Sequence, residues 1–454
     1  MKQTLLKSTM AVALGLVTVV SHADDDKDFT PIAGSAYSQM TDDATILNAT
    51  PWLIPQGYTQ SIIADESMLD IYAGKSDLGD MNTSNETRKK AGRFLYRAHE
   101  VRPGSDVNDF AGGAVSVVDL KRGEARVLVQ RKDWEAIDGM LWTPWGTILT
   151  AEETNRTALA DPQVPLAQSG LVYEIFLDKK DPSRATEVKV RPQIGSMAHE
   201  GIEVDEEGNI YVIDEDRAPG GHIFKFVPTR YGDLSKGQLY ALRVSGQQQT
   251  GVAEWVKLEL DQATFNAQAA AEAVGATSYC RPEDLERIGK TLYVALTCEP
   301  RVGGVDGPGA VLSVSLGKKP RVDYFVEVGV NVTAEDKAAG VTGFKRPDNL
   351  ANGPDGSLWI VEDNVPSDIW VAKPDRNRDG KSDGVQLFAS LRDSGAEGTG
   401  IYFAKGSDKL FVNVQHSVTG NDKTMAISRV EHDKDMQMNQ RDEQKRNKKE
   451  GKED

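Results

Sequence analysis

One recurring pattern in the middle of the chain restricts the folds that it can adopt. An acidic residue precedes a short apolar run, a tight turn, and a second segment rich in Ile, Val, Tyr, Trp and Phe that ends in polar residues. β-Branched and aromatic residues favour strands, and the Gly, Asp and Asn of each turn favour hairpins. The pattern occurs in five segments, which run over residues 138–153, 200–216, 283–299, 348–364 and 397–416.

Small antiparallel sheets repeated along a chain are typical of a β-propeller. The turn glycines of the five segments lie 50 to 81 residues apart, and residues 113–130 contain a further strand pair that could belong to a sixth unit. We therefore predict an all-β fold, a single six-bladed propeller over residues 24–430 with an axial metal site. Five blades, or a pair of β-sandwiches, are the alternatives.

The two ends of the chain differ from the repeated region. Residues 1–23 contain two lysines, an apolar run too short to span a membrane, and small residues around Ala23, which is typical of a signal peptide for general secretion. Residues 431–454 are almost wholly charged or polar, so we expect a disordered tail. These features predict a periplasmic or secreted protein.

The charge balance narrows the possible partners. The formal net charge is −16, so the chain lacks the basic patches that bind nucleic acid or an anionic membrane surface. An acidic excess suits hard cations, which prefer carboxylate oxygens. We expect a monomer that acts on small molecules.

Hairpin arithmetic predicts where the acidic residues meet. Residues equidistant from a turn lie opposite each other, which pairs Asp138 with Glu153, Glu200 with Asp214, Asp348 with Asp363, and Glu397 with Gln415. Carboxylates therefore recur at one end of several inner hairpins, and in a propeller that end is the mouth of the central channel. Like charges held close repel unless cations neutralise them, so the pattern predicts bound Ca²⁺, Mg²⁺, Mn²⁺ or ferric iron. Solvated hairpin ends are the alternative.

The same arithmetic pairs Cys280 with Cys298 and predicts a disulfide, with two unpaired thiols as the alternative. Arg281 and Arg346 each stand two residues before an acidic position, on the same face of an extended strand. A guanidinium beside a metal cluster suits phosphate binding, whereas a structural salt bridge is the other interpretation.

A separate loop has the spacing of a calcium site. Asp375, Asn377, Asp379 and Asp383 occupy positions 1, 3, 5 and 9 of an EF-hand-like pattern with Gly380 at position 6. Position 12 is glutamine, so the bidentate ligand would come from elsewhere. We predict a peripheral, structural calcium site, with an Asp/Gly-rich turn as the alternative.

Six short motifs together resemble the PhoX-type alkaline phosphatase family. They occur in the family's order and are YRAHE at 96–100, GTILTAEE at 146–153, HEG at 199–201, RPE at 281–283, RPDN at 346–349 and VNVQH at 412–416. The resemblance implies a six-bladed propeller whose axial calcium–iron cluster hydrolyses phosphomonoesters outside the cytoplasm. It also implies that Arg281 and Arg346 hold the phosphate, and that the cluster ligands are Glu100, Glu153, Glu200, Glu283, Asp348 and Asp363.

Two departures from the family pattern concern the iron. The family's iron-binding cysteine is replaced by Ala151, and the chain lacks the twin-arginine export signal that the family typically uses. A cluster of calcium alone, or of calcium with another metal, is therefore an alternative to calcium with Fe³⁺. A non-catalytic calcium-binding propeller scaffold and a calcium-dependent, lactonase-like hydrolase are the alternative functions.

Overall fold

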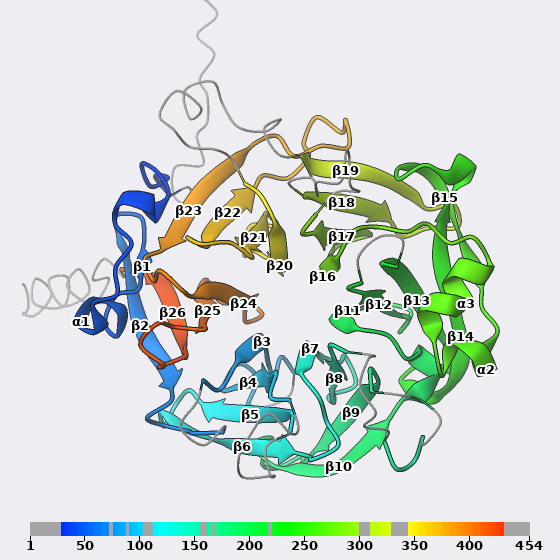
Figure 1. Ribbon diagram of the computed structural model, residues 1–454, viewed down its shortest axis with the longest axis horizontal. Helices are drawn as coiled ribbons and strands as arrows, with labels where there is room; N and C mark the ends of the chain where they lie inside the picture. The colour runs from blue at the N-terminus through cyan, green and yellow to red at the C-terminus, as the bar shows by residue number, and fades with distance from the viewer. Residues whose placement is uncertain are drawn as a thin grey trace, which may run out of the picture.

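Sheets of antiparallel strands surround a central axis in the computed structural model of the protein (Figure 1). The structure describes residues 29–71, 76–87, 90–102, 112–154, 161–164, 167, 169–216, 220–298, 309–327 and 344–430. The predicted signal peptide (1–23) and the predicted tail (431–454) lie outside these residues. The predicted all-β propeller fold is confirmed. None of the described helices is long and apolar enough to cross a membrane.

The first two units are four-stranded sheets. The first contains β3 (Gly79–Ser84), β4 (Phe94–His99), β5 (Ala114–Asp119) and β6 (Glu124–Gln130). The second contains β7 (Ile137–Trp142), β8 (Ile148–Glu152), β9 (Val172–Leu177) and β10 (Ala185–Val190). The strand pair expected at 113–130 thus forms the outer half of a unit whose inner hairpin, β3–β4, the sequence pattern did not reveal.

The next two units join at their outer edges into one nine-stranded sheet. One contributes β11 (His199–Val204), β12 (Ile210–Asp214), β13 (His222–Arg230), β14 (Asp233–Val244) and β15 (Gly251–Lys257). The other contributes β16 (Pro282–Ile288), β17 (Thr291–Leu296), β18 (Ala310–Ser315) and β19 (Arg321–Glu327). β15 pairs with β19, which places Gly251 opposite Val322.

Strands from near the N-terminus complete the last two units. β20 (Pro347–Asn352), β21 (Leu358–Glu362), β22 (Asp368–Ala372) and β23 (Val385–Leu391) pair with β1 (Trp52–Leu53). β24 (Glu397–Phe403), β25 (Leu410–Gln415) and β26 (Lys423–Arg429) pair with β2 (Tyr58–Asp65). Because β2 joins the most C-terminal strand, the two ends of the described chain close the ring through backbone hydrogen bonds.

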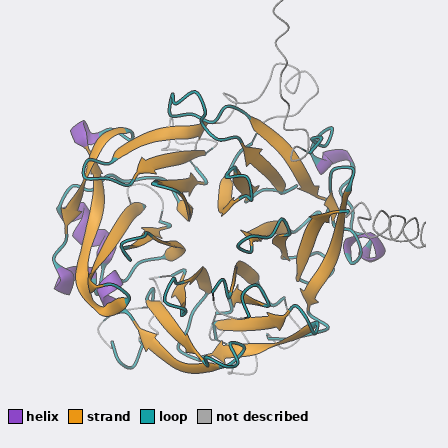
Figure 2. Cartoon of the chain, turned by 180° about the vertical axis from the view of Figure 1, so that it is seen from behind, coloured by secondary structure: helices purple, strands orange, loops and turns teal. Residues whose placement is uncertain are grey.

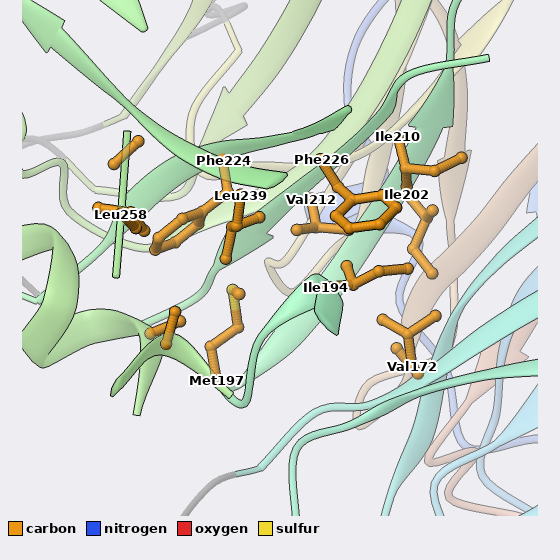
Figure 3. Packing of buried hydrophobic residues seen from close by; sticks show 14 of the residues in the cluster. Val172, Ile194, Met197, Ile202, Ile210, Val212, Phe224, Phe226, Leu239 and Leu258 are labelled. Carbon is orange, nitrogen blue, oxygen red and sulfur yellow. The ribbon is translucent and has the colours of Figure 1, made fainter. Parts of the chain in front are cut away.

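Helices are few and lie at the periphery (Figure 2). The described α-helices are α1 (Ala44–Leu47), α2 (Leu260–Ala263) and α3 (Ala267–Ala273), with short 3₁₀ turns η1 (Ala36–Ser38), η2 (Pro192–Ile194) and η3 (Ser245–Gln247). Alanines of α2 and α3 pack into one of the apolar cores that lie between adjacent sheets. In that core, Val172, Ile202 and Phe226 come from three different strands and lie close together (Figure 3). Such interlocking cores hold the inner strands at fixed positions around the axis.

Among the described residues, six innermost strands form a ring in which each contacts the next: β3, β7, β11, β16, β20 and β24. Each of these strands contains a β-bulge, in which two of its residues oppose one residue of the neighbouring strand. The bulge lies near the end of the strand where the acidic residues gather. It therefore determines which side chains face the axis.

The bulges overturn three of the predicted pairings. Asp138, Glu200 and Asp348 each lie inside a bulge, so the residue before each of them takes the paired position: Ile137 opposes Glu152, His199 opposes Asp214, and Pro347 opposes Glu362. The predicted pairing of Glu397 with Gln415 is confirmed, because those residues lie outside the bulge of β24.

Candidate metal centre

The first residue of the bulge is acidic in five of the six innermost strands. These residues are Asp80, Asp138, Glu200, Glu283 and Asp348, and all of them are buried. In β24 the corresponding residue is Gly400, whose positive φ of 55° and closeness to the Asp80 carbonyl leave no room for a side chain. One carboxylate per strand thus converges on the axis from five strands.

A second set of acidic residues follows the second strand in four of the six inner hairpins. The backbone N–H of Glu100, Glu153, Glu215 and Asp363 each donates to the carbonyl of the residue before the inner strand, at 2.9 to 3.0 Å. In the β16–β17 hairpin the same position is Thr297, which donates to the Arg281 carbonyl. This shared hydrogen bond fixes the second set beside the first at one end of the channel.

The two sets produce two compact groups of carboxylates. Asp80, Glu100 and Asp138 form one group, and Glu200, Glu215 and Glu283 form the other. Within each group, one oxygen of every carboxylate lies within 4.8 Å of the others. This spacing suits a shared cation.

The electrostatics of these groups also favour a cation. Burial raises the pKa values of Asp80 and Asp138 well above the ordinary range, and neighbouring carboxylates raise them further. Burial, followed by the nearby Glu283, does the same to the pKa of Glu200. The Oδ1 atoms of Asp80 and Asp138 have no hydrogen-bond partner among the described residues. Buried oxygens of this kind need a proton or a metal ion.

Two arginines lie among these acids: Arg102 lies near Glu153, and Arg281 makes the larger number of contacts. Its Nε and Nη2 donate to Glu215 Oε1 at 2.9 and 2.7 Å, and its Nε lies 3.1 Å from Glu283 Oε1. Its Nη1 lies 3.5 Å from Asp363 Oδ2. Arg281 has a φ of 43°, a left-handed conformation that turns the chain into β16.

Arg346 has the same place before β20 and a similar φ of 48°. Its side chain is exposed and makes no ion pair with the described residues. Of the two arginines predicted to hold a phosphate, one thus lies among the carboxylates and the other lies open to solvent.

The disulfide joins Cys280 and Cys298, whose Cα atoms are 5.3 Å apart. The bond links the two ends of the β16–β17 hairpin, immediately next to Arg281 and Thr297. It therefore limits the motion of the backbone that carries Arg281.

The six predicted ligands all lie near this end of the channel, but only three belong to the compact groups. These are Glu100, Glu200 and Glu283. Glu153 lies 3.3 Å from Arg102 Nη2, while Asp363 lies near Arg281, and Asp348 is buried near Glu283. The sequence prediction did not include Asp80, Asp138 and Glu215 among the candidate ligands, although Asp138 and Glu215 belong to the repeated hairpins. The only sequence signal for Asp80 is its position upstream of the YRAHE motif. Its strand, GDMNTS, is too polar to show the β-rich pattern of the other inner hairpins.

Ala151 occupies the position of the family's cysteine and is fully buried. Its methyl group belongs to the apolar cluster that contains Leu149 and Val172. No side-chain donor exists there, so the chain has no cysteine ligand for iron at this position.

The predicted calcium loop connects β22 to β23 at the periphery. Its oxygens bind the loop's own backbone: Asp375 accepts from the N–H of Arg378 and Gly380, Asn377 from Asp379, and Asp383 from Arg376. Asp375, Asp379 and Asp383 do not form a compact group of the kind found on the axis. Calcium binding by Asp375, Asn377, Asp379 and Asp383 stays a prediction.

The fold and the axial acids define a β-propeller with a candidate metal centre at one end of its channel. The chain belongs to the alkaline phosphatase PhoX family, whose family model matches residues 139–417.

The fold of a solved structure agrees with this one. Pseudomonas fluorescens PhoX in complex with vanadate, a transition state analogue, is 20% identical with a TM-score of 0.65, covering 88% of this chain and 98% of that one. A Xanthomonas campestris gluconolactonase is 13% identical with a TM-score of 0.42, covering 89% and 96%. No curated protein sequence matches the chain significantly.

Proposed function

We propose that the protein is an exported, metal-dependent phosphohydrolase that cleaves phosphomonoesters at the acidic end of its channel. The observation that carries this proposal is the position of Arg281, whose guanidinium lies among carboxylates that could hold cations. Membership of a phosphatase family and the vanadate complex of a similar structure support the same reaction class.

The residues fit a centre made of hard cations. The donors are carboxylate oxygens, which Ca²⁺ prefers, and two of them lack any partner among the described residues. We propose that Ca²⁺ is held by the predicted ligands Glu100, Glu153, Glu200, Glu283, Asp348 and Asp363 together with Asp80, Asp138 and Glu215. Bound cations would supply Lewis-acid stabilisation of phosphoryl oxygens. Iron fits less well, because Ala151 offers no ligand.

The arginines would orient the ester. The guanidinium fork of Arg281 matches two phosphate oxygens, and its contacts to Glu215 and Asp363 hold the fork in place. Its charge would stabilise the negative charge that develops as water adds to phosphorus and the ester P–O bond breaks, releasing an alcohol and inorganic phosphate. Arg346, exposed at the equivalent place, would bind the phosphate from a second side.

Other features support the proposed location of the protein and the class of its substrate. The disulfide is typical of an oxidising compartment, in agreement with export to the periplasm or beyond. The acidic chain favours small soluble esters over nucleic acid. We propose that the protein acts as a monomer.

The test combines elemental analysis with turnover of p-nitrophenyl phosphate on one preparation of the mature protein. We expect calcium to copurify and chelation to abolish turnover, with recovery when calcium is restored. Bis(p-nitrophenyl) phosphate and a gluconolactone serve as comparison substrates and should react far more slowly. Faster hydrolysis of either would assign a diesterase or a lactonase instead.

Ala151 supports one competing function, a non-catalytic calcium-binding propeller scaffold. In that case the protein would hold stoichiometric calcium but show no turnover after calcium, iron and manganese are supplied in turn. Restoring a cysteine with Ala151→Cys would then test whether the lost ligand explains the inactivity.

A further inference from the structure

The β24–β25 hairpin differs from the other five inner hairpins at the acidic end of the channel. Its bulge holds Gly400, so β24 has no carboxylate at the place where the other inner strands have one. The residue that follows its second strand is His416. This hairpin therefore carries an imidazole at the position where four of the others carry a carboxylate.

His416 lies beside a carboxylate that belongs to neither compact group. Its Nε2 is 3.6 Å from Glu397 Oε1, which is an ion-pair distance. Glu397 begins β24 and is paired with Gln415, so the contact crosses the open end of the hairpin. A carboxylate on one ring nitrogen fixes the orientation of an imidazole and leaves the other nitrogen for proton transfer.

The pair is continuous with the arginine that we propose binds the phosphate. Burial and then the adjacent Asp363 raise the pKa of Glu397, to about 8. Asp363 Oδ2 in turn lies 3.5 Å from Arg281 Nη1. Only Glu397 and Asp363 therefore separate the imidazole from the guanidinium fork.

His416 is accessible to a substrate. Its side chain is 51% exposed, whereas that of Arg281 is 25% exposed. The charged groups that face it are carboxylates: Glu397 of β24, Glu100 after β4, and Asp422 before β26. His416 is not a member of either compact carboxylate group, and Ca²⁺ prefers oxygen ligands to nitrogen. A position at the rim suits contact with the departing part of a substrate.

Hydrolysis of a phosphomonoester needs a proton at the leaving oxygen. When the ester P–O bond breaks, its electron pair stays on the oxygen of the alcohol, and an alkoxide is a strong base. A positioned acid lowers this barrier. Arg281 can stabilise charge on the phosphoryl oxygens, but a guanidinium does not give up a proton in proteins. The proton must therefore come from another group.

We propose that His416 is the general acid of the phosphatase, which rests on the function proposed above. The imidazolium donates the proton of Nδ1 to the ester oxygen as the P–O bond breaks, and a neutral alcohol leaves. The attacking water keeps one proton on the inorganic phosphate and passes the other to solvent, from which His416 regains its proton. Glu397 is a positioning residue that orients the ring through Nε2.

The test compares two esters on the calcium-loaded mature protein. p-Nitrophenolate is a stable anion that leaves without a proton, whereas the phenolate released from phenyl phosphate is a much stronger base. His416→Asn removes the acid, and asparagine tolerates the φ of 60° at this position. We expect kcat/KM for phenyl phosphate to fall by about 10²- to 10⁴-fold, with a loss at least about tenfold smaller for p-nitrophenyl phosphate.

Further variants separate proton transfer from a structural role. Glu397→Gln should produce the same selectivity with a smaller loss, because the ring remains but its orientation is no longer fixed. Val418→Ala, in the loop after β25 and 45% exposed, should leave the ratio of the two rates unchanged. Added imidazole should restore phenyl phosphate hydrolysis to His416→Ala, since the position is open to solvent. If one His416 variant fails to fold, the other decides the question.

Two results would overturn the role of His416 while leaving the phosphatase proposal intact. One is an equal loss for both esters in His416→Asn. The other is a loss of bound calcium from that variant, which would make His416 a metal ligand. A wild-type protein that hydrolyses neither ester would overturn both proposals.

Discussion

Arg281 Nη2 lies 2.7 Å from Glu215 Oε1, although 66 residues separate them along the chain. Each residue stands at the end of a different inner hairpin, and the ring of inner strands brings the two together. This ion pair therefore connects Arg281, which we propose binds the phosphate, to one of the two compact carboxylate groups.

Glu215→Gln should weaken the metal centre. The substitution removes one carboxylate from the group that contains Glu200 and Glu283, so we expect less bound calcium per chain and loss of phosphatase turnover. Elemental analysis after dialysis measures the first effect. Glu187→Gln, an exposed residue of β10, is the matched control and should retain full occupancy. Unchanged calcium in Glu215→Gln would remove this residue from the ligand set.

Arg281→Lys should reduce kcat/KM for p-nitrophenyl phosphate by about 10²- to 10³-fold, as expected for removal of a donor to developing charge. Arg346→Lys should cost about tenfold, because its side chain has no fixed partners among the described residues. Arg230→Lys, 80% exposed on a distant strand, serves as the control. A larger loss for Arg346→Lys would reverse the roles of the two arginines.

The metal-free protein should lose stability as the pH rises. Burial raises the pKa of Glu283 to about 7 and that of Glu397 to about 8, whereas an unfolded glutamate has a pKa of about 4.3. A group whose pKa is raised in the folded state stabilises the protein fully when the pH is below the pKa of that group in the unfolded state. This stabilisation is lost as the pH rises through the pKa of the group in the folded state.

We therefore expect the gap in Tm between calcium-loaded and chelated protein to widen from pH 4.5 to pH 8.5. Thermal unfolding across that range measures it. Glu283→Gln should narrow the gap at high pH. A gap that stays constant with pH would show that the pKa values of these carboxyl groups are not raised in the folded protein.

Gly139→Ala should destabilise the protein by about 2 to 4 kcal/mol. Gly139 is the second residue of the β7 bulge, and a Cβ there would lie 1.9 Å from the Glu200 carbonyl oxygen. Because this atom belongs to the backbone of β11, the inner strands would have to separate. Gly317→Ala is the control, since a Cβ there meets nothing within 4 Å. Denaturant unfolding compares the two, and equal stabilities would contradict the close approach.

Removing the disulfide with the pair Cys280→Ser and Cys298→Ser should cost about 3 kcal/mol, a value typical of a closed loop of this length. The two cysteines are 18 residues apart. Turnover should fall as well, because Arg281 adjoins Cys280. Retention of full activity in the folded double variant would show that the bond does not position Arg281.

Local sequence determined much of this protein. Alternation and turn residues identified five of the inner hairpins, the register that brings Cys280 next to Cys298, and the end of the channel where acids gather. These are short-range properties, because a strand's two faces and a hairpin's pairing depend on residues close in the chain.

The tertiary structure decided which acids meet. A bulge shifts the register of the hairpin by one residue. Gly139 and Gly201 are the second residues of two such bulges, and there the backbone of the next inner strand approaches closely. Simple hairpin arithmetic therefore misplaced Asp138, Glu200 and Asp348. Asp80 joined Asp138 because the ring of inner strands places β3 beside β7, a contact between two successive units that no local pattern encodes.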